Sequence, residues 1–378
     1  MPTVPVKLPQ RVSDWQSAVI AKGLAGDTIH GAKLASASQF EYEQFLLLRV
    51  LWVSHENRDL QKLLPWFGRW TTEADRLLKE YKSWDAYCRG FTAGDLEEGS
   101  FAVARYYQLE VGNTAKEADP TTYLTPIAHR TRARFLQETF DNMHLQTPSK
   151  STGVSKLIDI EDMGSEDMIL GTPIAETPSP FRPISPAPKE LERILYPPSQ
   201  DEQIVNCALI VFLNALTIHF KIASNWTLHR KAFTAVFDGA SFEARTDGYL
   251  NHHGKAKVIV EVKPAKRSSK RELIQMQESA QMVAWIKSED EELNNDNIKK
   301  TRLHVSQDRH EIFLTVAEYD GDYVKYLNDK HHHSDAPSFM TMHCFGPWDT
   351  REPGHMRMLG PILLGISLRA DDEERAGE

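Results

Sequence analysis

The apolar positions of residues 201–216 repeat with the period of an α-helix. Apolar side chains three and four positions apart lie on one helical face, and here they are Val205, Ala208, Leu209, Phe212, Leu213 and Leu216. Ser199, Asp201 and Glu202 come directly before or at the start of this run, as is typical of a helix start. We therefore expect an amphipathic helix that packs on the rest of a domain.

A second pattern, with a period of two, predicts a β-hairpin over residues 245–264. Residues 245–250 and 258–264 favour strands, and the Asn-His-His-Gly stretch between them is typical of a turn. Because side chains alternate along a strand, Glu261 and Lys263 point to one face. The opposite face carries Val258, Val260 and Val262, which can pack against a helix.

Further elements complete an α/β arrangement. A strand is expected at 233–237, before the hairpin, and a helix at about 268–287, after it. Two more strands, 302–306 and 311–317, are joined by a short polar turn. The resulting order is a helix, three strands, a helix and one or two strands, which predicts an α/β domain.

The rest of the chain divides by composition. Residues 1–146 are expected to form a mainly helical region in which nothing indicates catalysis. Residues 147–198 are rich in Ser, Thr and Pro, which favours a largely disordered linker. We assign the α/β domain to residues 199–370, and an acidic tail, expected to be disordered, to residues 371–378.

Composition narrows the location of the protein. The 378 residues carry a net charge of −9 and are 41% hydrophobic, which suffices for one large core or two modest ones. The chain has no run of about eighteen apolar residues and no amino-terminal secretion pattern. We therefore expect an intracellular protein, nuclear or cytoplasmic, that is neither secreted nor membrane-bound. Cys88, Cys207 and Cys344 show no C-x-x-C spacing and predict neither a zinc site nor disulfides.

Two carboxylates and a lysine are brought together by the predicted hairpin. Asp247 lies 14 residues before Glu261, so pairing of the two strands places both acids at one end of a sheet, beside Lys263. Carboxylate oxygens are ligands that suit Mg²⁺, and such an ion activates water and stabilises the charge that develops on phosphate. An amine beside them would orient the attacking water or help to deprotonate it. This set predicts a metal site that acts on a phosphodiester.

These residues resemble the motif of the PD-(D/E)XK nuclease superfamily. Asp247 stands in the place of its first acid and residues 261–263 match its E-x-K, while Thr246 replaces the usual leading proline. Asp-Gly-Tyr-Leu, a hairpin, Glu-Val-Lys-Pro and a glutamine-rich helix are similar in particular to nuclease-like domains of filamentous fungal proteins. The resemblance implies a restriction-endonuclease-like core made of a helix, a three-stranded meander, a helix and a strand. It also implies Mg²⁺-dependent hydrolysis of phosphodiester bonds, in DNA more than in RNA, with Mn²⁺ as the alternative ion.

The resemblance adds residues from two helices to the predicted site. Superfamily members often place an acid of the first core helix near the metal, and Glu202 is the matching position; alternatively, Glu202 only complements the helix dipole. A glutamine often follows on the helix after E-x-K, and Gln277 or Gln281, one turn apart, fits that place; alternatively, they form a solvent-exposed polar face. The predicted metal ligands are thus Asp247, Glu261 and Glu202, with Lys263 and Gln277 as the other catalytic residues.

Basic residues gather around the predicted site although the whole chain is acidic. Between positions 230 and 271 there are ten Lys or Arg and four Asp or Glu. Such an excess favours contact with the phosphates of nucleic acid, whereas a nuclear import signal or a solvated loop would have the same composition. The predicted phosphate contacts are Lys266, Arg267, Lys270, Arg271 and Arg245.

Two other functions fit the same residues. A nuclease fold without activity would bind nucleic acid or protein without cutting it, although degenerate copies usually lack an acid or the lysine, and this chain retains all three. A structural protein with a chance match to the motif would hold Asp247 and Glu261 apart or point their carboxylates away from each other. The positions of these two side chains therefore test the last interpretation.

Overall fold

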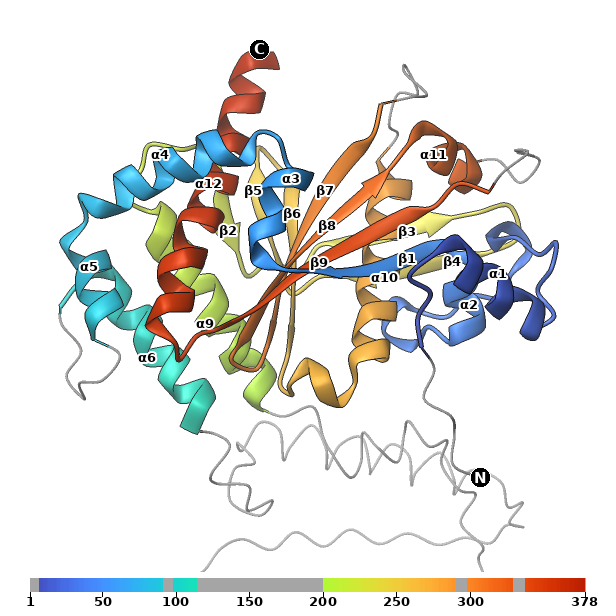
Figure 1. Ribbon diagram of the computed structural model, residues 1–378, viewed down its shortest axis with the longest axis horizontal. Coiled ribbons are helices and arrows are strands. Elements are labelled where there is room, and N and C mark those ends of the chain that lie inside the picture. The colour runs from blue at the N-terminus through green and yellow to red at the C-terminus, as the bar shows by residue number, and fades with distance from the viewer. Residues whose placement is uncertain (1–6, 91–97, 114–199, 290–297, 329–336, 378) are drawn as a thin grey trace, which may run out of the picture. The chain divides into compact units, whose positions relative to one another are not determined.

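The computed structural model of the chain describes residues 7–90, 98–113, 200–289, 298–328 and 337–377 (Figure 1). One compact unit takes in both Met1–Lys116 and Pro198–Glu378. The first part of the chain and the predicted α/β domain thus share one unit instead of forming two. The predicted linker, residues 147–198, lies outside the described residues.

A seven-stranded mixed sheet forms the centre of this unit. In spatial order its strands are β1 (Val50–His55), β9 (Met340–Asp349), β8 (Glu311–Tyr319), β7 (Lys300–Asp308), β6 (Lys255–Lys263), β5 (Gly248–His252) and β2 (Asn225–Thr227). The β6–β7 and β1–β9 pairs are parallel, and the other pairs are antiparallel. The predicted hairpin over 245–264 and the predicted strands at 302–306 and 311–317 are confirmed.

Helices cover both faces of the sheet (Figure 1). α9 (Gln200–Thr217) lies against the face that carries Val258, Val260 and Val262, and these side chains share one core with its apolar stripe. α10 (Arg271–Ser288) covers the other face, where Ile259 joins a second core. The two predicted helices are therefore confirmed, and β6 lies between them.

The remaining helices join one or the other of these layers. α3 (Leu60–Leu63), α4 (Phe67–Lys79), α5 (Lys82–Arg89), α6 (Ser100–Asn113) and α12 (Pro353–Gly377) pack on the side of α9, and α1 (Val12–Ala21), α2 (Tyr42–Leu47) and α11 (Gly321–Asn328) pack on the side of α10. Among the described residues, no helix combines the length and the apolar character that crossing a membrane requires.

The strand predicted at 233–237 does not join the central sheet. β3 (Ala232–Val236) pairs with β4 (Ser241–Arg245) in a separate two-stranded ribbon that packs on α10. Alternate residues of both strands are buried in the core on that side, so the ribbon gains its contacts without pairing with β5. The fold is α/β with a mixed sheet, but the strands before α10 are divided between two sheets instead of forming one three-stranded meander.

Two segments form elements that were not predicted from the sequence. The apolar run of residues 40–52 contains helix α2 but ends in strand β1, with Arg49 at a φ of 52° between them. The described part of the first region is mainly helical, as predicted, but it also contributes β1, an edge strand of the central sheet. The acidic tail is ordered as far as Gly377, where α12 ends. Within it Asp371 is buried, and its Oδ1 accepts a hydrogen bond from the Ala223 amide at 2.6 Å.

Candidate active site

Asp247 is fixed at the start of β5, beside the last residues of β6. Its amide donates to the Val260 carbonyl at 2.9 Å, and its Oδ2 accepts from the Val262 amide at 3.1 Å. Its Oδ1 accepts from Nη2 of Arg230 at 3.0 Å, and its carbonyl accepts from Nδ2 of Asn206 on α9 at 2.9 Å. These contacts hold the carboxylate against the end of β6, where the side chain is 8% exposed.

Glu261 and Lys263 lie on the face of β6 that α10 covers. Lys263 Nζ donates to Glu261 Oε1. Two glutamines of α10 donate to the same carboxylate, Gln277 Nε2 to Oε1 at 2.5 Å and Gln281 Nε2 to Oε2 at 2.6 Å. Since Gln281 is buried and Gln277 is half-buried, with both amides turned toward Glu261, they do not form a solvent-exposed polar face.

The two acids stand at the same end of paired neighbouring strands. Gly248, which follows Asp247, pairs with Val260, which precedes Glu261. The charge of Asp247 contributes, after burial, to a raised pKa of the Glu261 carboxyl group, so the two groups interact electrostatically. The hairpin therefore brings Asp247 and Glu261 together beside Lys263, and a chance motif with distant acids does not describe this chain.

Burial dominates the ionisation of this cluster. It raises the pKa of Glu261 to about 8, and the charge of Asp247 adds to the rise, while Lys263 and Gln281 oppose it. Burial lowers the pKa of Lys263, but the carboxylates of Glu261, Glu202 and Asp247 outweigh it and hold that pKa above its ordinary value. Lys263 is therefore protonated at neutral pH. A further positive charge placed beside Glu261 would favour the ionised form of its carboxyl group.

Glu202 lies in the first turn of α9 and within electrostatic range of the same cluster. Burial raises the pKa of its half-buried carboxyl group, Lys263 and Arg230 oppose the rise, and Asp247 adds to it. An acid in the first turn also complements the helix dipole. Its position is thus compatible with both interpretations, the metal-supporting one and the purely helical one.

The carboxylates of Asp247 and Glu261 suit Mg²⁺ better than a metal that needs a complete protein shell. Mg²⁺ is commonly held by one or two carboxylates and takes its other ligands from water and substrate phosphates. Within the described part of the chain, no group of three or more His, Cys, Asp or Glu side chains is placed to hold a metal ion. The predicted ligands Asp247, Glu261 and Glu202 are therefore not arranged as a three-ligand site, and binding of Mg²⁺ by the two carboxylates stays a prediction.

Arg267 belongs to a second buried cluster and not to a phosphate-binding surface. Its side chain is 4% exposed, with Nε 2.5 Å from Asp308 Oδ2 and Nη2 donating to Ser306 Oγ at 2.8 Å. Nη2 also pairs with Glu278 of α10, and the guanidinium lies 4.1 Å from the ring centroid of Phe313. The predicted phosphate contact of Arg267 is therefore wrong, because its donors are used inside the protein.

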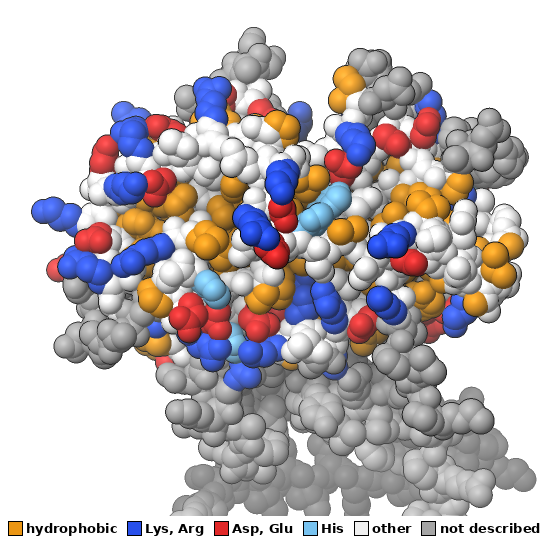
Figure 2. Space-filling view, in the orientation of Figure 1, with side chains coloured by type: hydrophobic (Ala, Val, Ile, Leu, Met, Phe, Trp, Pro, Cys, Tyr) orange, Lys and Arg blue, Asp and Glu red, His pale blue; other side chains and the backbone are white. Residues whose placement is uncertain are grey.

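The other four predicted phosphate contacts keep accessible side chains. Lys270 and Arg271 are exposed at the start of α10, whereas Lys266 and Arg245 pair with carboxylates at 3.1 Å and 2.6 Å. Figure 2 shows Lys and Arg interspersed with Asp and Glu across the described part of the visible face. That face carries no broad field of one sign. Contact of the four residues with nucleic acid stays a prediction.

Arg230 and Asn206 contact the site but stand in no motif. Arg230 lies in the irregular stretch between β2 and β3, 17 positions before Asp247, and the β3–β4 ribbon returns the chain to it. Asn206 lies on α9, 41 positions away from the carbonyl it contacts. The one sequence signal for Arg230 was the excess of basic residues that begins there, and Asn206 had none.

Comparison with known proteins identifies no family for this chain. No protein-family model matches the chain, and no significant match was found among curated proteins or solved structures. The function is therefore inferred from the residues of the site.

Proposed function

We propose that this protein is a metal-dependent nuclease that hydrolyses phosphodiester bonds, in DNA more than in RNA. The observation that carries the proposal is the meeting of Asp247, Glu261 and Lys263 at one end of the β5–β6 hairpin. Two acids and an amine within reach of one another supply what metal-assisted hydrolysis of a phosphodiester requires. The preference for DNA rests on the resemblance to PD-(D/E)XK nucleases.

Asp247 and Glu261 would hold Mg²⁺ or Mn²⁺, with Glu202 supporting the ion or its water. When bound, the ion would supply a Lewis acid for the charge that develops on phosphate and would lower the pKa of a water molecule. Gln277 and Gln281 donate to both oxygens of Glu261 and so restrain the rotation of its carboxylate. Helix α10 thereby holds the Glu261 carboxylate at the end of the hairpin.

Lys263 acts in this proposal as a donor and not as a base. The acids around it hold its pKa above the ordinary value, so it carries a proton at neutral pH. Its side chain is 20% exposed, which leaves the ammonium group accessible beside the nearly buried Glu261. It would orient the attacking water and donate to a phosphate oxygen.

Arg230 provides a second cation at the solvent side of the site. Its side chain is 62% exposed, and Nη2 occupies Oδ1 of Asp247. Because the rest of this side chain is in solvent, it can leave Oδ1 to an ion and donate to a substrate phosphate. Such an exchange keeps the positive charge that the phosphate needs.

A cleavage assay tests the proposal. The full chain is incubated with single-stranded and double-stranded DNA and RNA in Mg²⁺, Mn²⁺ or EDTA at fixed salt. Cleavage is expected with either ion and is lost in EDTA. Lys263→Ala should slow it at least about 100-fold, since the loss of one positioned donor to the developing charge costs about 10²–10³-fold. Lys255→Ala removes an exposed lysine at the other end of β6 and should keep full activity; unchanged cleavage by Lys263→Ala would reject the mechanism.

A nuclease fold that binds nucleic acid or protein without cutting is the second candidate. It is favoured by the low exposure of the Asp247 and Glu261 side chains, 8% and 3%, and by their hydrogen bonds to protein donors. This alternative predicts a shifted band in a gel-retardation assay and intact substrate under every metal condition. Lys263→Ala should then bind as the wild type does.

A further inference from the structure

The turn between β7 and β8 lies at the end of the sheet where β6 leads toward α10 (Figure 1). Arg309 is the first of its two residues, and its amide donates to the Lys263 carbonyl at 2.8 Å. Along this end of the sheet, Asp247 therefore comes before β5, Lys263 ends β6 and Arg309 follows β7. Neighbouring strands are about 4.8 Å apart, so about 10 Å separates the first of these positions from the last.

The turn holds Arg309 in a backbone conformation that is unfavourable for arginine. Its φ is 59°, in the left-handed region that glycine and asparagine adopt more readily. The buried Gln307 donates from Nε2 to the Arg309 carbonyl at 2.6 Å, and the Thr350 amide donates to the carbonyl of His310 at 2.8 Å. These contacts fix the turn. A strained residue that its surroundings fix in this way is typical of a functional position.

The guanidinium group of Arg309 is available to a ligand. The residue is partly exposed, and within the described ranges its side chain forms no hydrogen bond or ion pair. The two acids next to the turn already have other cations as partners. Asp308 pairs with Arg267 at 2.5 Å, and Glu311 pairs with Lys266 at 3.1 Å.

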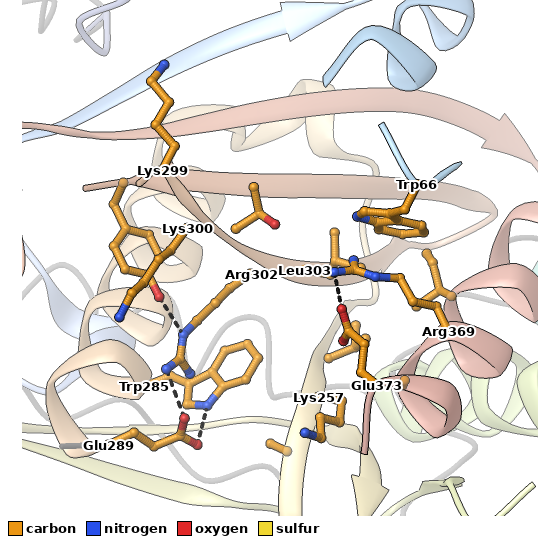
Figure 3. Close-up of a pocket in the computed structure, with 16 residues that line it drawn as sticks. Trp66, Lys257, Trp285, Glu289, Lys299, Lys300, Arg302, Leu303, Arg369 and Glu373 are labelled. Atoms are coloured by element: carbon orange, nitrogen blue, oxygen red, sulfur yellow. Dashed lines mark hydrogen bonds and ion pairs between the residues drawn. The ribbon is translucent and has the colours of Figure 1, made fainter. Parts of the chain in front are cut away.

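Three other arginines are held by partners inside the protein. Arg302 and Arg369 line a groove at the opposite end of the sheet, where each lies on a tryptophan ring and donates to a glutamate (Figure 3). Arg267 is sealed between two carboxylates. Arg309 has no such partner among the described residues, so a phosphate would not have to displace one.

We propose that Arg309 binds the phosphate next to the scissile one, so that the substrate strand runs along the end of the sheet from β5 to β7. This inference rests on the proposed nuclease function. Arg230 is placed to contact a phosphate on the β5 side, Lys263 lies at the point of cleavage, and Arg309 lies on the β7 side. A guanidinium fork can bind two phosphate oxygens at once, which positions the strand without reading its bases.

Salt titrations of DNA binding test the inference with Arg309→Gly. Glycine removes the cation and suits a φ of 59°, so the variant should stay folded, with an unchanged or higher urea midpoint. Binding of fluorescein-labelled single-stranded and double-stranded DNA is measured in EDTA, so that metal-dependent cleavage does not interfere. Loss of one phosphate contact should reduce the slope of log K against log salt by about 0.7–0.9 and the affinity at about 0.1 M salt by about fivefold. Arg309→Lys keeps the charge and should keep the slope.

Matched variants separate this contact from general effects of charge and of backbone strain. Lys255→Gln removes one exposed charge at the other end of β6, and His253→Gly replaces an exposed residue there whose φ is 46°. Both should keep the wild-type slope. A reduced slope in Arg309→Gly without any cleavage in Mg²⁺ would support the phosphate contact and reject the nuclease. Cleavage together with an unchanged slope in Arg309→Gly would support the nuclease and overturn the inference. Absent DNA binding, or an equal loss in Lys255→Gln, would also overturn it.

Discussion

Two clusters of buried charge lie at the ends of neighbouring parallel strands and are built from the same kinds of residue. The first joins Glu261 and Lys263 of β6 to Asp247, and the second joins Arg267 to Asp308 of β7. The two strands are in register, with Lys263 beside Asp308. Both clusters combine acids with a cation at the same level of the sheet. They differ in access to solvent and not in the kinds of residue that they contain.

The first cluster reaches solvent through its cations, and the second is sealed. The side chains of Lys263 and Arg230 are 20% and 62% exposed, whereas that of Arg267 is 4% exposed and its two carboxylate partners are fully buried. A sealed ion pair contributes to packing, because no substrate reaches it and breaking it leaves a buried charge. A cluster with accessible cations can exchange its internal partners for a ligand, which is why the nuclease proposal rests on the first.

Arg267→Met should cause the largest change and tests whether the second cluster is structural. Removal of the guanidinium leaves Glu278 and Asp308 buried without a cation, which typically costs about 3–5 kcal/mol of unfolding free energy. Urea unfolding measures this loss. Arg245→Met, which breaks an exposed ion pair, should cost less than about 1 kcal/mol. Similar losses in the two variants would show that burial does not distinguish these ion pairs.

Gln281→Leu should have the next largest effect and tests how firmly α10 holds the first cluster. The amide donates to Glu261 Oε2 and to the Arg245 carbonyl, and an unsatisfied buried acceptor costs about 1–3 kcal/mol. The exposed Gln203 of α9 offers a matched control, Gln203→Leu, with little expected change. If urea unfolding gives equal free energies for both variants, the glutamine does not stabilise the carboxylate.

The raised pKa of Glu261 makes the stability of the first cluster depend on pH. Its folded-state pKa of about 8 lies above the ordinary 4.5, so the folded protein binds more protons than the unfolded chain between these values. The resulting stability is complete below about pH 4.5 and is lost as the pH rises toward 8, by at most about 1.4 kcal/mol per unit. Urea unfolding in EDTA should show Glu261→Gln gaining relative to the wild type as the pH rises. A difference that is constant with pH would contradict the raised pKa.

The first cluster was largely predictable from local patterns, and the second was not. Strand alternation places Glu261 and Lys263 on one face, and the spacing of one helical turn directs Gln277 and Gln281 to the same carboxylate. Arg267, by contrast, lies in a basic stretch that reads as a solvated loop, and its partners are 11 and 41 positions away. Only the tertiary fold shows that this one cation of the stretch points inward.

The parts of the fold that the sequence did not predict also depend on contacts between residues far apart in the chain. Helices α9 and α10 and the β5–β6 hairpin follow from periodicity and turn residues within one segment. The separation of the β3–β4 ribbon from the sheet depends on packing against α10, and the pairing of β1 with β9 joins residues almost 300 positions apart. Strand pairing of this kind leaves no local signal, because the apolar run of β1 suits a helix and a buried strand alike.

Arg230→Gln should change stability least, yet it bears most directly on access to the first cluster. An ion pair with one side chain 62% exposed contributes about 0–1 kcal/mol, so the free energy of unfolding should fall by no more than that. At the proposed metal site, the variant removes a cation from Asp247 Oδ1 and should tighten Mn²⁺ binding by at most about fivefold, the equivalent of the same small energy. Calorimetric titration with Mn²⁺ measures this, with Arg245→Gln as the control. Weaker binding in Arg230→Gln would mean that the arginine does not compete with the ion but holds Asp247 in the orientation that binds it.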